Sequence, residues 1–364
     1  MKAKAAVFTG AFKPFDVRDF EVTETPSGYG RCELIASGVC GTDLHFHRGK
    51  LPIQPPTVIG HEFVGKLVDC NREEAKKYGL KTGDNVIADI AVPCGECLLC
   101  KSGDDANCVN MKVTNGGSID EAPYLYGGYA EINYTPLSNF IKIPNEIDPK
   151  AAAVFACPGP TVVHSFSLAK RAGITVDGNT VAVVQGIGPV GIFAVIYLKT
   201  LNVKKIYVIG SKENKSREEL VKKLGADKVF SINKDGAENI KSELQAQNSG
   251  LGVDLCFEAS GAPSAVPFGM NILRNRGVYL IPGQYSNSGG VEIQPQLITF
   301  KALQILGSSQ YSLCDVKYYL EFMKEHLNLC QTILKLGSFY SITDVNKAFE
   351  DAESGKNIKT LLVK

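Results

Sequence analysis

VAVVQGIGPVG, at residues 181–191, joins an apolar β-branched run to three glycines with the spacing G-x-G-x-x-G. The run before the glycines is typical of a buried strand, and residues 190–200 after them are typical of a helix. In such a strand–turn–helix, Gly186 makes the tight turn, Gly188 lets a pyrophosphate approach the backbone, and Gly191 lets the helix pack closely on the strand. The helix N-terminus then presents its partial positive charge to the phosphates. The stretch predicts a dinucleotide site that includes Gly186, Gly188, Pro189, Val190 and Gly191.

Strand and helix patterns alternate on both sides of this stretch, from about residue 151 to residue 300. We expect helices at 151–172, 190–200, 216–224 and 265–273, and strands at 180–184, 205–209, 229–230, 253–257 and 278–281. This alternation is typical of the α/β class, with a doubly wound parallel sheet covered by helices on both faces.

The segments before and after this region have a different character. Residues 1 to about 150 are rich in glycine, proline and short β-branched runs, which predicts short strands joined by turns. After residue 300 we expect a helix at 314–326 and a last strand at 359–363. We therefore divide the chain into an all-β domain at 1–154, a cofactor domain at 155–300 and a return segment at 301–364.

Composition excludes several classes of protein. The 364 residues include 39 basic and 38 acidic side chains, so a broad basic surface for nucleic acid is not expected. Glycines and a proline interrupt the longest apolar stretch, residues 181–198, which argues against a membrane span. Eleven cysteines follow a start that lacks the apolar core of a signal peptide, and this predicts a reduced, cytoplasmic protein.

Four of the cysteines lie within fifteen residues. Cys94, Cys97, Cys100 and Cys108 have the spacing C-x2-C-x2-C-x7-C, inside a lobe at about 93–110. Zinc binds four thiolates tetrahedrally, and a turning loop supplies three of them at short spacings. A closed site of this kind has no position for substrate, so its role is structural. An iron–sulfur centre, a redox dithiol and unrelated core cysteines are the alternatives, and the last spacing does not fit the common ferredoxin patterns.

A second set of ligand-type residues is more widely spaced. Catalytic zinc needs three protein ligands and an open fourth position, and Cys40, His61 and Cys157 would supply two thiolates and an imidazole. Glu62 is an alternate ligand, and Asp43 is a candidate partner for the other ring nitrogen of His61. Each of these residues taken alone is more often a packed residue than a ligand.

The motifs together resemble those of a known family. GVCGTD at 38–43, GHE at 60–62 and the four-cysteine lobe occur in the order found in zinc-dependent medium-chain dehydrogenases, which include alcohol, polyol and threonine dehydrogenases. The resemblance spans essentially the whole chain. It implies a GroES-like all-β catalytic domain beside a Rossmann cofactor domain, assembled into a homodimer or homotetramer.

The same resemblance assigns roles to particular residues. It implies that Cys40, His61 and Cys157 bind the catalytic zinc with Glu62 close by. Thr42 would contact the substrate hydroxyl and His45 would pass its proton to solvent. The cofactor would be held by Thr161 and the glycine turn, with Lys359 near its pyrophosphate.

The choice between NAD and NADP depends on the end of the strand at 205–209. An acidic residue there would bind the ribose 2′-hydroxyl of NAD, but this chain has Ser211 at the expected position. Ser211 and Lys212, with Arg217 nearby, favour a 2′-phosphate and therefore NADP. In the alternative, Glu213 reaches the ribose and the cofactor is NAD.

We predict a zinc-dependent oxidoreductase that transfers hydride between a small alcohol or polyol and NAD(P), with two zinc ions per chain. Cys157 matches the alcohol dehydrogenases, whereas Pro158 and His164 match the polyol and threonine enzymes, so both substrate classes stay open. A metal-independent reductase of the same superfamily is a competing interpretation, as is a non-catalytic paralogue that binds zinc and nucleotide. The predicted partner is a small molecule rather than a nucleic acid or a membrane.

Overall fold

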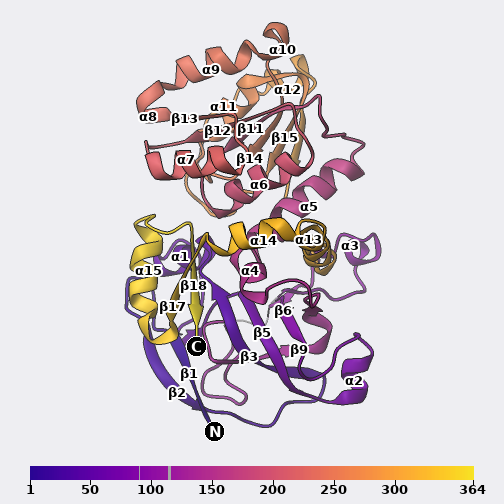
Figure 1. The fold of residues 1–364 in the computed structure, drawn as a ribbon, viewed down its shortest axis with the longest axis vertical. Helices are drawn as coiled ribbons and strands as arrows, with labels where there is room; N and C mark the ends of the chain where they lie inside the picture. Colours follow the sequence, from indigo (N-terminus) through magenta and orange to yellow (C-terminus); the bar gives the residue numbers. More distant parts are fainter. Residues whose placement is uncertain (90, 114–115) are drawn as a thin grey trace. The chain divides into compact units, whose positions relative to one another are not determined.

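The computed structural model describes residues 1–89, 91–113 and 116–364, and these form two compact units (Figure 1). Unit 1 contains Met1–Pro160 and Tyr311–Lys364, and unit 2 contains Thr161–Gln310. Unit 1 is therefore built from both ends of the chain, and unit 2 is one continuous stretch between them.

Unit 2 is built around a parallel sheet of six strands in the order β13-β12-β11-β14-β15-β16. The strands are β11 (Val181–Gln185), β12 (Lys205–Gly210), β13 (Lys228–Ser231), β14 (Val253–Glu258), β15 (Leu273–Ile281) and β16 (Gln304–Gly307). The strand order reverses between β11 and β14, and ligands of such sheets bind at this point, outside the carboxyl ends of the strands. This sheet confirms the predicted α/β class.

Helices cover the sheet, as the alternating pattern predicts. They are α5 (Pro158–Arg171), α6 (Pro189–Thr200), α7 (Lys215–Leu224), α8 (Ile232–Asp235), α9 (Ala237–Gln245), α10 (Gln247–Gly250), α11 (Ala265–Ile272) and α12 (Gln296–Phe300). Proline is the first residue of α6 after the N-cap Gly188, where its missing N–H costs nothing and its fixed φ suits the helix. Every residue of β11 is buried, which explains the continuous apolar run in the sequence.

Unit 1 contains a sheet of seven strands, in which the path β10-β6-β5-β3-β18-β17 is joined by β9 pairing with β3. These strands are β3 (Tyr29–Gly38), β5 (Glu62–Cys70), β6 (Asn85–Ala88), β9 (Ile132–Pro136), β10 (Phe140–Lys142), β17 (Gly337–Ser341) and β18 (Lys359–Val363). A second sheet has the order β2-β1-β4, from β1 (Lys2–Phe8), β2 (Asp16–Glu21) and β4 (Thr57–Val58), and β7 (Ala91–Val92) pairs with β8 (Lys112–Val113). The C-terminal strand β18 pairs antiparallel with β3, with Leu361 opposite Gly38.

The helices of unit 1 are short before residue 149 and longer near the C-terminus. They are α1 (Gly41–His47), α2 (Arg72–Lys76), α3 (Leu98–Lys101), α4 (Pro149–Val154), α13 (Leu313–Glu325), α14 (Leu327–Leu334) and α15 (Val345–Glu353), with 3-10 turns at Asp105–Asn107, Leu137–Asn139 and Ile342–Asp344. Within the described ranges, no helix has both the length and the apolar character to cross a membrane.

The single helix predicted at 151–172 is wrong. The structure has α4 and α5 instead, with residues 155–157 between them. Pro158 lacks the N–H that a continuous helix would need there, and the break places Cys157 outside a regular helix.

Candidate functional site

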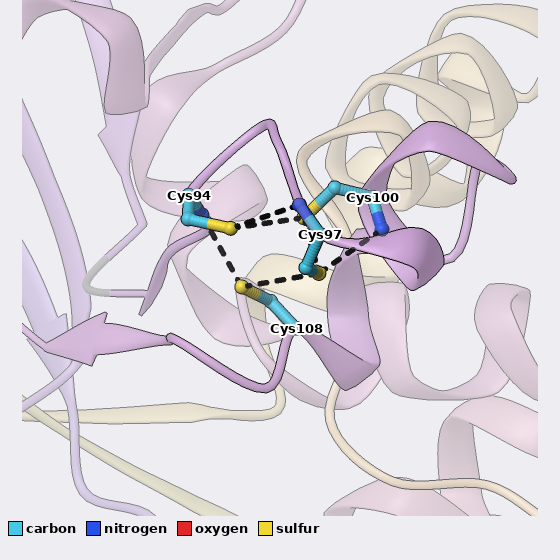
Figure 2. Close-up of side chains that lie close together, drawn as sticks. All are labelled: Cys94, Cys97, Cys100 and Cys108. Atoms are coloured by element: carbon cyan, nitrogen blue, oxygen red, sulfur yellow. Dashed lines mark hydrogen bonds between the residues drawn. The ribbon is translucent and has the colours of Figure 1, made fainter.

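The four cysteines of the lobe converge on one point, as Figure 2 shows. The Sγ atom of Cys97 lies 3.5 Å from that of Cys100 and 4.0 Å from that of Cys108, and the Sγ atoms of Cys94 and Cys100 are also 4.0 Å apart. Four thiolates held tetrahedrally at about 2.3 Å from zinc would lie ~3.8 Å from one another. The geometry of this sulfur group therefore fits a closed zinc site.

Backbone N–H groups stabilise thiolates in the same lobe. N–H groups of Glu96 and Cys97 lower the pKa of Cys94 to about 6, and N–H groups of Cys100 and Val109 lower the pKa of Cys97. Burial and the neighbouring thiol of Cys97 raise the pKa of Cys100 to about 12. These N–H groups thus stabilise the thiolate forms of Cys94 and Cys97, the form in which cysteine binds zinc.

Replacing Cys97 by serine tests the structural role. We expect the zinc content to fall from two ions per chain to one, and the midpoint of thermal unfolding to fall by about 5 °C or more, because metal binding contributes to the folding free energy. The control is Cys314→Ser, which changes an exposed cysteine outside the lobe. If Cys97→Ser keeps two zinc ions, the lobe does not hold one.

The second ligand set comes from three separate segments. Ligand atoms of Cys40, His61, Glu62 and Cys157 all lie within 4.8 Å of one another. Cys40 is the N-cap of α1 just after β3, and His61 directly precedes β5. The pairing of β3 with β5 sets Gly38 opposite Glu62, and this register brings the two loops together. Cys157 reaches the group from the break between α4 and α5.

Asp43 orients the imidazole in this group. Asp43 is fully buried, and its Oδ1 lies 3.4 Å from Nδ1 of His61, which leaves Nε2 of His61 available as a ligand. Its Oδ2 accepts hydrogen bonds from the N–H of Cys40 at 2.9 Å and from the hydroxyl of Tyr129 at 2.7 Å. The sequence predicted the role of Asp43 but not the contribution of Tyr129, which lies 86 residues away along the chain.

Glu62 forms a buried ion pair with Lys359. The Nζ of Lys359 donates to Oε1 of Glu62 at 2.6 Å and to the carbonyl oxygen of Val39 at 3.0 Å. Burial raises the pKa of Glu62 to about 7, although the positive charge of Lys359 acts in the opposite direction. A Cβ atom at Gly38 would collide with the Glu62 carboxylate, so the pair needs glycine there. The structure thus gives Lys359, which we expected near a pyrophosphate, two partners in unit 1.

Thr42 and His45 lie on the first turns of α1, three residues apart and therefore on one side of the helix. The Oγ1 of Thr42 is 3.8 Å from the Sγ of Cys40, which places the hydroxyl beside the ligand group. Burial, assisted by Lys50 and Arg48, lowers the pKa of His45, so its ring is neutral at neutral pH and can accept a proton.

The glycine turn of unit 2 has the geometry that a nucleotide requires. Gly186 has φ +108°, and Gly188 is the N-cap of α6, with no heavy atom within 4 Å of the position a Cβ would take. A Cβ at Gly191 would collide with the carbonyl oxygen of Gly186. Open backbone at the N-terminus of α6 therefore fits a pyrophosphate.

The adjoining strand β12 ends beside this turn. Gly210 approaches the side chain of Ile187 in the glycine turn, and Ser211 follows it directly. The guanidinium of Arg217 donates from Nη1 to the carbonyl oxygen of Ile187 at 2.9 Å. Glu213 is engaged elsewhere, since its Oε1 lies 3.1 Å from the Nζ of Lys234.

Thr161 lies on α5, where its carbonyl oxygen accepts from the hydroxyl of Ser165 at 2.9 Å. The Oγ of Ser165 also lies 2.9 Å from the Oγ of Ser308, whose hydroxyl can donate to it, so this turn of α5 is tied to the segment after β16. The contact of Thr161 with the cofactor stays a prediction.

Comparison with known proteins agrees with this geometry. Residues 31–145 match the model of the alcohol dehydrogenase GroES-like domain, and residues 189–325 match the model of zinc-binding dehydrogenases. D-xylulose reductase A from Aspergillus niger is 30% identical over 334 residues, covering 90% of this chain and 87% of the relative. L-threonine 3-dehydrogenase from Pyrococcus abyssi is 28% identical, covering 95% of this chain and 94% of the relative.

The fold is also found in solved structures. The crystal structure of an alcohol dehydrogenase from Thermotoga maritima has a TM-score of 0.89 and 26% sequence identity, covering 100% of this chain and 99% of that one. This structural match agrees with the resemblance seen in the sequence motifs, and so do the two family models and the relatives. The chain belongs to the family of zinc-dependent medium-chain dehydrogenases and reductases.

Proposed function

We propose that this dehydrogenase interconverts a secondary alcohol of a small polyol or hydroxy amino acid with the corresponding ketone. The observation that carries the proposal is the group formed by Cys40, His61 and Cys157, with the hydroxyl of Thr42 beside it. Relatives named for threonine, sorbitol and xylulose support this class of substrate. A non-catalytic paralogue would have no need to keep these groups together.

The residues divide the chemistry among them. Cys40, His61 and Cys157 would hold a zinc ion, which would supply a Lewis acid that lowers the pKa of a substrate hydroxyl, and the glycine turn would hold a nicotinamide cofactor, which would supply the hydride donor or acceptor. Asp43 keeps the His61 ring in one orientation and one tautomer. As the substrate hydroxyl gives its proton to Thr42, the Thr42 hydroxyl would release its own proton, and the neutral His45 on the same face of α1 would take that proton up and release it to solvent.

The test is an absorbance assay for the reduced nicotinamide with a panel of alcohols. We expect turnover with polyols or with threonine that exceeds turnover with simple primary alcohols of equal concentration. Zinc content per chain, measured on the same preparation, should be two. Turnover restricted to primary alcohols would overturn the substrate class, and no turnover from a zinc-loaded protein would overturn the function.

We further propose that NADP is the preferred nucleotide. The position that would carry the acid for NAD is Ser211, which follows β12 beside the glycine turn, and Arg217 is anchored close by on Ile187. Glu213, the alternative partner of the ribose, lies instead against Lys234. A serine with nearby cations suits a phosphate, since charge-assisted hydrogen bonds to phosphate are strong.

Replacing Ser211 by aspartate should reverse this preference. The new carboxylate repels the 2′-phosphate and accepts from the ribose hydroxyls of NAD, and like charges in contact cost several kcal/mol. We expect the ratio of kcat/KM for NADP to that for NAD to fall about a hundredfold. Glu213→Gln is the matched control, because it leaves this ratio unchanged if Glu213 does not touch the ribose. A wild-type preference for NAD would contradict the proposal.

We also infer a homodimer or homotetramer that works in the reducing cytoplasm. β16 is an edge strand of the unit 2 sheet, and large apolar side chains before it are exposed, among them Phe300 at 76% and Val291 at 41%. An open edge beside exposed apolar groups supports pairing with a second chain, which light scattering tests through the molar mass in solution.

Both cysteine groups bind metal only as thiolates, which supports a reducing compartment.

A further inference from the structure

A buried carboxylate lies at the point where the strand order of unit 2 reverses. Glu258 is the last residue of β14, the strand that pairs with β11, and its side chain is 0% exposed. The glycine turn follows β11 at the same edge of the sheet. Burying a carboxylate costs free energy unless hydrogen bonds compensate for the lost water. The groups that donate to Glu258 are therefore the parts of the chain that it holds in place.

The donors to Glu258 come from two loops at this edge. Its Oε1 accepts from the N–H of Ser260 at 2.7 Å, from the hydroxyl of Ser260 at 2.5 Å and from the N–H of Gly261 at 3.0 Å. Its Oε2 accepts from Nε2 of Gln284 at 3.1 Å, which also donates to the carbonyl oxygen of Ala262. The carboxylate thus fixes residues 259–262, which we call the 259–262 turn, and ties it to the loop after β15.

The 259–262 turn lies directly against the glycine turn. A Cβ atom at Gly186 would come within 2.9 Å of the carbonyl of Ala259 and of the N–H of Ser260. The N–H of Ala259 donates to the carbonyl oxygen of Gln185 at 2.8 Å, which joins the two turns at their base. Ser260 and Ala262 are exposed, so the outer side of this turn is open to a ligand that occupies the glycine turn.

Other glycines show how tightly the carboxylate is enclosed. A Cβ at Gly283 would collide with Oε2 of Glu258, and a Cβ at Gly261 would come within 2.9 Å of the carbonyl oxygen of Gly283. The chain therefore uses small residues to bring both loops around one carboxylate. A larger residue at either position would therefore disturb the contact between the two loops.

We propose that Glu258 is a positioning residue for the nicotinamide nucleotide, because it holds the 259–262 turn as the second wall of the nucleotide crevice beside the glycine turn. The inference rests on the proposed use of this nucleotide. Glu258 does not touch the ligand. Its carboxylate acts through the backbone of Ser260 and Gly261, whose N–H groups it holds inward.

The experiment is a titration of zinc-loaded protein with NADPH, followed by nicotinamide fluorescence, which is clean because the chain has no tryptophan. Glu258→Gln keeps the shape of the side chain but points an amide N–H₂ at donors. We expect its Kd for NADPH to rise about tenfold, which corresponds to the loss of one or two hydrogen bonds. The KM for the nucleotide should rise by the same factor, and kcat at saturating nucleotide should stay within about twofold.

Two further variants keep the outcome interpretable. Gln284→Ala removes the outer donor from a half-buried position and should raise the Kd about threefold, in the same direction. Glu243→Gln, which changes an exposed carboxylate paired with Lys228 in the same unit, is the control and should leave the Kd unchanged.

The outcomes separate this inference from the proposed function. If wild-type protein binds no nicotinamide nucleotide, the proposed function fails. If wild type binds and Gln284→Ala and folded Glu258→Gln bind equally well, Glu258 is not a positioning residue. A lower kcat and lower thermal stability with unchanged KM would show a purely structural role and also overturn the inference.

Discussion

Replacing Cys40 or His61 by alanine lowers kcat/KM by about three orders of magnitude or more, while the protein stays folded. A zinc ion held by this group would supply several kcal/mol of transition-state stabilisation, and each 1.4 kcal/mol corresponds to a factor of about ten. Stability is affected less, because Cys40 lies in a loop and both residues pack at the end of a sheet whose strands remain paired. The measurements are steady-state kinetics, zinc content and thermal unfolding.

Measuring the zinc content shows whether the loss of activity comes from the second ligand group alone. Each variant should keep one zinc ion per chain, since the four-cysteine lobe shares no residue with the second group. Cys70→Ser is the matched control, because it changes a half-buried cysteine of unit 1 that belongs to neither group, and it should keep both ions and full activity. Activity retained by a metal-free preparation of Cys40→Ala would count decisively against the mechanism.

Alanine at Gly188 and alanine at Gly191 should have clearly different effects, although both change the same fingerprint. Gly188 has φ −82° and open space around the Cβ position, so alanine fits there without strain. The free energy of unfolding should then change by less than about 0.5 kcal/mol. The methyl group would occupy the open space where we expect the pyrophosphate to bind, so nucleotide affinity should fall about tenfold or more.

Alanine at Gly191 instead collides with the carbonyl oxygen of Gly186 inside the protein itself. Either α6 or the turn must shift, and overpacking of this kind costs about 1–3 kcal/mol of stability. Nucleotide affinity falls as well, because the turn is displaced. Urea unfolding with and without nucleotide distinguishes the two variants, and equal stability of Gly191→Ala and wild type would contradict the close approach of helix and strand.

Most of the prediction for unit 2 was based on local sequence patterns. The strand at 180–184 and the helix at 190–200 correspond closely to β11 and α6, because a buried strand, a glycine turn and an apolar helix each leave a strong local signal. The helix predicted at 151–172 failed because buried residues on both sides of Cys157 continue the helical pattern. The signal of the break is Pro158, which lacks the N–H that a continuous helix needs, and this break lets Cys157 lie near Cys40.

Contacts between residues that are far apart in the sequence left no comparable signal in the local sequence pattern. Lys359 meets Glu62 only because β18 pairs with β3, and β3 with β5, in one particular register. Tyr129 reaches Asp43 from a loop that precedes β9. Cysteine spacing identified the lobe because its four cysteines are close in sequence, whereas these partners depend on strand pairing that no local pattern specifies.

The pairing of β18 with β3 also determines when unit 1 is completed during synthesis. Residues 161–310 form a continuous unit that emerges from the ribosome before β18 does. Until then the end of β3 that pairs with β18 is open, and the carboxylate of Glu62 lacks its lysine. Open strand edges are prone to pair with other chains, so a nascent protein is most exposed to aggregation in this interval. Unit 1 is thus completed after unit 2, although its first 160 residues are translated before unit 2.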